Sequence, residues 1–284
     1  LTATDRATAH RLAAAYLATT DRTHPRVIAE HFRVAEARAE ALPYYLTAAA
    51  QAYQQDDTPE AERCALHAVD CGAAGAELGM LRAIQTLAHV HRLELPPAER
   101  LGEAALGLLP AGSLWWCRAA GLLCLFYGQT QRLGPALALV QALLQAEPTP
   151  EAQTAYCESL SKILSALSQF ALRSLAERVQ ARLAQLGDRQ PMDALALGWV
   201  HLAQSDYLRN LAPSPFVQRQ HLLTASHHAQ AAGAATTWIV VQDELALVYS
   251  ELGDRETALS TGRASLQRAR ELRLAYAINH ASLH

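Results

Sequence analysis

The chain has 284 residues and a formal net charge of −3, and 51% of its residues are hydrophobic but only 6% aromatic. Its arginines form no basic run and Lys162 is the only lysine, so we expect no nucleic-acid partner. The richest apolar stretch, residues 122–127, is far too short to span a membrane and no signal peptide is present, so we expect no membrane partner and a cytoplasmic protein.

Alanine dominates the composition, at roughly a fifth of all residues. It has the best helix propensity and lets neighbouring helices approach closely. The alternation of Val, Ile and Thr that is typical of strands is nearly absent. The composition therefore predicts an all-α protein that is held together by contacts between small residues.

Proline and glycine clusters divide the chain into amphipathic segments of about 12 to 22 residues. These segments predict about fourteen helices with short connections, so that neighbouring helices run antiparallel. The helix that follows the second break should begin with Thr58 as its N-cap and Pro59 at its first position. In chain order the breaks fall at residues 23–26, 56–60, 71–75, 95–97, 109–113, 133–135, 147–151, 186–191, 212–215, 231–234 and 252–254.

A repeat is clearest near the C-terminal end of the chain. There a small residue, Ala246, is followed three positions later by Tyr249, then by Gly253 and by a second small residue, Ala258. Gly253 permits the left-handed backbone that ends a helix, and the two alanines mark places where helix axes pass closely. Equivalent small positions are Ala61, Ala98, Ala136 and Ala176 on second helices, spaced by 37, 38 and 40 residues, and Ala49 and Cys124 on first helices, the latter followed by Tyr127.

This pattern resembles the tetratricopeptide repeat, although the period is longer than that family's. The match is good for residues 244–266, fair for 44–70, 80–110 and 116–148, and weakest for 154–232. The resemblance implies a right-handed superhelical solenoid of about seven antiparallel helix pairs, which we expect to form one domain over residues 1–284. Looser arrays of this kind are similar to the C-terminal sensor regions of large bacterial signalling ATPases of the STAND type, some of which carry a serine/threonine kinase domain. Because the chain begins at Leu1, we expect it to be a fragment of such a longer protein.

Motifs for catalysis are absent from the sequence, including phosphate-binding loops and the kinase, lipase and zinc-protease signatures. The five cysteines include no Cys-x-x-Cys pair, and we expect buried reduced thiols. Of the twelve histidines, His89 and His91 diverge on a helix, as do the adjacent His227 and His228. We therefore expect a protein that is not an enzyme and that has no metal site and no cofactor.

First helices line the concave face of such an array, and this face is where solenoids usually bind their partners. The residues expected there form a mixed polar surface with no dominant sign of charge. Trp199 points to this face if Gly198 holds the small position, and otherwise it belongs to the core. The concave-face candidates are Tyr53, Gln54, His91, Arg118, Gln129, Ser165, Gln169, Trp199, Asp243 and Glu251.

Two functions fit these features. The first is a non-catalytic scaffold or sensor of a bacterial signalling protein that binds a protein or peptide, including its own upstream domains, on the concave face. The alternative is a small-molecule sensor that controls the assembly of a parent ATPase or transcription regulator. The alternative requires an enclosed pocket with aromatic walls, for which Trp115, Trp116 and Trp199 are the candidates. Packing of the paired tryptophans between helices is the competing interpretation.

Overall fold

The computed structural model describes residues 2–20, 23–92, 94–189 and 192–272, and in these ranges every regular element is helical. They hold fourteen α-helices and one short 3₁₀-helix, which confirms the all-α prediction. The α-helices are α1 (Ala3–Leu17), α2 (Pro25–Val34), α3 (Arg38–Gln54), α4 (Thr58–Asp70), α5 (Gly75–His91), α6 (Leu95–Leu108), α7 (Leu114–Gln129), α8 (Leu133–Gln145), α9 (Gln153–Gln169), α10 (Arg173–Arg189), α11 (Ala194–Asn210), α12 (Pro215–Ala231), α13 (Ala235–Glu251) and α14 (Arg255–Glu271). The chain divides into two compact units, Leu1–Phe126 (unit 1) and Tyr127–His284 (unit 2), which are described separately.

In unit 1, each helix from α1 to α5 packs against the helix that follows it, and α3 also contacts α5. This contact between α3 and α5 joins the first helices of successive pairs, as in a helical solenoid. The interior of the unit is built largely from small residues: Ala49, Ala61 and Ala98 are each at most 1% exposed. Buried alanines at these repeat positions let the helix axes approach closely.

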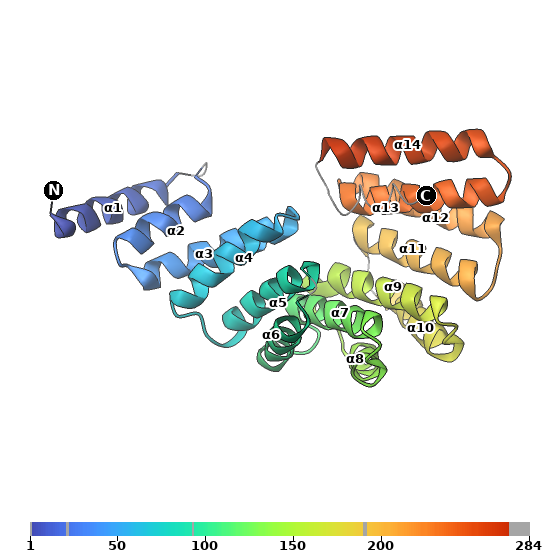
Figure 1. The fold of residues 1–284 in the computed structure, drawn as a ribbon, viewed down its shortest axis with the longest axis horizontal. Coiled ribbons are helices and arrows are strands. Elements are labelled where there is room, and N and C mark those ends of the chain that lie inside the picture. Colours follow the sequence, from blue (N-terminus) through green and yellow to red (C-terminus); the bar gives the residue numbers. More distant parts are fainter. Residues whose placement is uncertain (1, 21–22, 93, 190–191, 273–284) are drawn as a thin grey trace. The chain divides into compact units, whose positions relative to one another are not determined.

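In unit 2, the same arrangement recurs, because α9 packs against both α10 and α11, and α11 to α14 pack in sequence (Figure 1). Polar groups as well as apolar ones hold the first of these helices in place. Tyr156 on α9 is fully buried, and its hydroxyl donates to the Leu143 carbonyl of α8 at 2.6 Å. Arg182 on α10 donates to the Ala146 carbonyl at 2.8 Å and to the Tyr156 hydroxyl at 3.1 Å. The end of α8 is thereby tied to α9 and α10.

The glycines and prolines of the sequence predict some of the turns between helices but not all of them. Gly253 has a φ of 83° directly after α13, the left-handed conformation for which the glycine was singled out. Glu36 and Ala171, however, adopt the same conformation with φ values of 57° and 55°. They produce two helix ends, after α2 and after α9, that no Gly or Pro announces in the sequence.

The predicted cap of α4 is wrong by one residue. Asp57 is the N-cap, and its side chain accepts a hydrogen bond from the Glu60 amide at 3.1 Å. Thr58 is instead the first helical residue. An aspartate preceding Thr-Pro competes for the cap position and places its negative charge at the positive end of the helix dipole.

All five cysteines are free thiols. Four of them are buried and Cys71 is half-buried, so the expectation of buried thiols is confirmed for Cys64, Cys117, Cys124 and Cys157. Burial raises the pKa of Cys124 and of Cys157 to about 12. These thiols therefore act as small apolar core residues.

Within the described ranges, no helix combines the length and the apolar character that crossing a bilayer requires.

Candidate functional site

Three residues from two first helices of unit 1 form an aromatic–arginine cluster, which consists of Tyr53 on α3 and of Trp115 and Arg118 on α7. The Arg118 guanidinium carbon lies 4.7 Å from the centroid of the Tyr53 ring and 4.8 Å from that of the Trp115 ring. The two rings meet edge to face, with centroids 5.0 Å apart. Such a cation–π arrangement fixes the guanidinium by contact with ring faces.

The local sequence of α7 explains why this cluster forms. Trp116, Cys117 and Ala120 turn into the core, so that the apolar stripe of the helix is buried. Trp115 lies at the edge of this stripe and packs, partly buried, against the apolar core of unit 1. Arg118 follows three residues later on the same side of the helix, where Tyr53 from α3 reaches it.

The charge of Arg118 is not balanced by an acid. Its Nη1 atom is out of contact with water and has no hydrogen-bond acceptor, and Arg118 forms no ion pair within the described part of the chain. An arginine presents five donors in a planar fork that matches a carboxylate. The cluster is therefore chemically suited to an anionic group delivered by a partner.

Five of the predicted concave-face residues lie at or near the C-terminal ends of first helices and are exposed. Their side chains are polar or charged, and each is open to a partner. They are Gln54 on α3, His91 on α5, Gln129 on α7, Gln169 on α9 and Glu251 on α13.

Two of the predicted residues are buried, and for them the prediction of an open binding position is wrong. Trp199 is only 8% exposed, so the core alternative holds for it, and the Lys162 ammonium lies 5.2 Å from its ring centroid. Asp243 is 3% exposed and accepts a hydrogen bond from the Ser265 hydroxyl at 2.6 Å, which ties α13 to α14. The helical period predicts on which side of its helix each residue lies. It does not predict how deeply the neighbouring helix buries that side.

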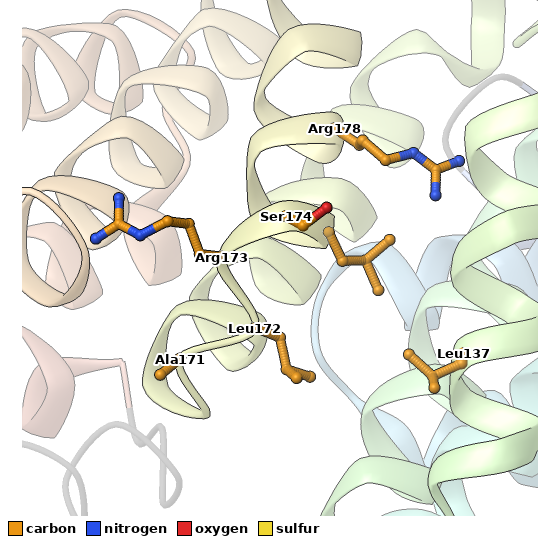
Figure 2. A pocket seen from close by; sticks show the side chains of 7 residues that line it. Leu137, Ala171, Leu172, Arg173, Ser174 and Arg178 are labelled. Atoms are coloured by element: carbon orange, nitrogen blue, oxygen red, sulfur yellow. The ribbon is translucent and has the colours of Figure 1, made fainter.

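Of the paired tryptophans, Trp116 is a core residue, and Trp115 belongs to the cluster described above. Two open hollows occur in unit 2, one at the start of α10 (Figure 2) and one along α14, and no aromatic side chain lines them. No group of three or more potential ligands in the described ranges is arranged to hold a metal ion.

Sequence reasoning missed a polar group on the first helices of unit 2. Asp206 on α11 hydrogen-bonds Ser165 on α9, a predicted concave-face residue. Burial and the neighbouring Glu244 carboxylate raise the pKa of Asp206 to about 7, and Arg209 forms an ion pair with Glu244 of α13. One signal was present in the sequence, because Asp206 lies seven residues after Trp199 and hence on the same buried face of α11.

No family model matches the sequence, and no curated protein is significantly similar to it. Among solved structures, the chain is similar to a Rap protein complexed with competence and sporulation factor, with a TM-score of 0.52. The match covers 85% of this chain and 69% of that one at 11% sequence identity, a level at which the likeness shows the fold alone. That structure is a tetratricopeptide-like helical repeat. This chain therefore has a tetratricopeptide-like, all-α solenoid fold.

Proposed function

We propose that residues 1–284 form one non-catalytic interaction module that binds a protein or peptide on its first helices. The observation that carries this proposal is the Arg118 guanidinium, which packs against the rings of Tyr53 and Trp115 on a side chain that is half-buried. Because the Arg118 side chain is already immobilised, less conformational entropy is lost when a partner carboxylate binds there. The exposed polar residues at the ends of the first helices would supply the dispersed contacts around this anchor.

The Rap structure with which the chain shares its fold is itself a complex with competence and sporulation factor, which supports a binding role for a fold of this kind. We further propose that the module belongs to a bacterial signalling protein of the STAND ATPase type and acts in the cytoplasm. Its partner would then be either a separate protein or the upstream domains of its own chain. Neither nucleic acid nor a membrane has a place in this proposal.

A small-molecule sensor was the competing function. It required an aromatic-walled pocket, and Trp116 and Trp199 are instead packed in the core. No observation favours this function over binding of a protein.

The proposal is tested by Arg118→Ala in the tagged full-length protein, isolated from its own cells. Arg63→Ala is the matched control, since Arg63 is an exposed arginine of the same unit that pairs with Glu60 of its own helix. We expect a defined set of co-isolated proteins to fall at least about tenfold with Arg118→Ala, a loss of about 1.4 kcal/mol in binding, and to persist with Arg63→Ala. Equal recovery with both variants, at equal melting temperature, would contradict the proposal.

A further inference from the structure

A second surface, on second helices of unit 2, has the properties of a docking groove. It lies between α8 and the start of α10 and is an open hollow of about 440 Å³ (Figure 2). Its floor consists of Leu137 from α8 and of Ala171, Leu172 and Leu175 from the turn before α10 and its first residues. It is separate from the Arg118 cluster, since it uses other helices in the other unit.

The apolar side chains of this groove are accessible to a partner. Leu137 is 39% exposed and Leu172 is 41% exposed. Leu133, one turn before Leu137, and Phe170, in the same turn as Leu172, are exposed by 54% and 63%. Single exposed apolar residues are normal on a protein surface, but four large ones on two adjoining elements indicate an interaction site.

The charge around the groove has one sign. No acidic residue lines it, and of its two arginines only Arg178 directs its charge to this side (Figure 2). The Arg173 guanidinium points away, donates to the Leu211 carbonyl at 2.5 Å and lies 3.9 Å from Glu177. Arg178 is held in place by donating to the Gln141 side chain of α8 at 2.9 Å. The helix α10 begins at Arg173, and the residue before it, Leu172, has no side-chain acceptor to cap the amides. The positive end of the helix dipole adds to the positive charge of Arg178.

We propose that this groove docks an acidic amphipathic segment of a partner protein. A leucine-, isoleucine- or phenylalanine-like side chain of the partner enters between Leu137 and Leu172, and a neighbouring carboxylate lies against Arg178 and the start of α10. Apolar contact provides the anchor, and complementary charge provides orientation and discrimination against basic segments.

The test uses three synthetic helical peptides that carry a fluorescent label. The first has leucine at i, i+3, i+4 and i+7 with glutamate at the flanking positions, the second has lysine in place of glutamate, and the third has serine in place of leucine. Fluorescence anisotropy with the whole chain measures their affinities. We expect the leucine–glutamate peptide to bind at least about tenfold more tightly than either of the others.

The variants then assign the binding to this groove. Leu137→Ser combined with Leu172→Ser, and separately Arg178→Glu, should each weaken the leucine–glutamate peptide by about tenfold or more. Leu66→Ser, which alters a leucine of α4 that is 51% exposed, is the control and should leave the affinity unchanged. Because the altered side chains are exposed, the variants should keep the wild-type melting temperature.

Three results would overturn the proposal. They are the absence of binding by the wild-type chain, equal affinity for the glutamate and lysine peptides, and undiminished binding by the groove variants. A wild-type dimer that becomes monomeric in the Leu137→Ser, Leu172→Ser variant would show that the groove is filled by a second copy, which also contradicts it.

Discussion

Gly102 of α6 lies directly against Leu123 of α7, so closely that a Cβ atom on Gly102 would stand 2.5 Å from a methyl carbon of Leu123. Leu123 is fully buried. A glycine in a helix interior destabilises the helix by about 1 kcal/mol relative to alanine. The close contact with Leu123 explains why a glycine nevertheless occupies this position of the repeat.

We therefore predict that Gly102→Ala destabilises unit 1 by about 1–3 kcal/mol, despite the gain in helix propensity. Gly107→Ala on the same helix is the control, since a Cβ there meets no atom within 4 Å and the change should be neutral or slightly stabilising. Urea unfolding followed by circular dichroism gives both values. Equal stability of the two variants would show that α6 and α7 do not pack as described.

A second prediction concerns Arg182, whose guanidinium donates to the Ala146 carbonyl and the Tyr156 hydroxyl and pairs with Glu147 at 3.0 Å. Its removal leaves a buried carbonyl and a buried hydroxyl short of a donor, which costs about 2–3 kcal/mol. Arg182→Ala should therefore lower the free energy of unfolding by that amount. Arg178→Ala, an exposed arginine on the same helix, should change it by no more than about 0.5 kcal/mol. Similar losses for the two variants would contradict the assigned network.

A third prediction follows from Asp206, whose pKa is raised to about 7 by burial and by the Glu244 carboxylate. A carboxyl with a raised folded-state pKa retains its proton in the folded state, so its contribution to stability is lost as the pH rises from its ordinary value of 3.8 through about 7. Asp206→Asn keeps the neutral form at every pH. We expect the variant to be more stable than the wild type by about 1 kcal/mol at pH 8 and by less at pH 5. Thermal unfolding at the two pH values measures this, and a pH-independent difference would refute the assignment.

His201 of α11 and His221 of α12 give the opposite dependence on pH. Their Nδ1 atoms are 2.9 Å apart, so one must donate to the other, and His228 stacks on His201 with ring centroids 5.9 Å apart. Burial, with the neighbouring histidines, lowers the pKa of His201 to about 4 from its ordinary value of 6.5. The folded state therefore resists protonation, and stability is lost as the pH falls from about 6.5 to about 4.

His201→Phe keeps a ring between the two helices and removes the titrating group. We predict that the fall in melting temperature between pH 7.5 and pH 5 is smaller in this variant than in the wild type. His227→Phe is the control, because His227 is exposed and only its edge meets His228. If both variants lose as much stability on acidification as the wild type, the His201–His221 contact does not exist in solution.

Much of the fold could be predicted from the sequence, because alanine spacing and glycine and proline breaks are local signals. The ends of α2 and α9 could not be predicted. Glu36 and Ala171 adopt a left-handed backbone conformation there, which is unfavourable for residues other than glycine and which no sequence signal indicates. For the candidate site, helical period placed Tyr53 and Arg118 on first helices, but their meeting with Trp115 depends on how α3 and α7 pack. Depth of burial was the least predictable property, as Trp199 and Asp243 show, because it is decided by neighbours distant in the sequence.

The proposed function places another protein against the face around Arg118. A photo-crosslinking amino acid at Gln54, which is exposed and adjacent to Tyr53, tests this in the full-length protein in its own cells. We expect a discrete protein adduct that disappears with Arg118→Ala and persists with Arg63→Ala. The absence of any protein adduct at this position, or an adduct that Arg118→Ala leaves unchanged, would contradict it.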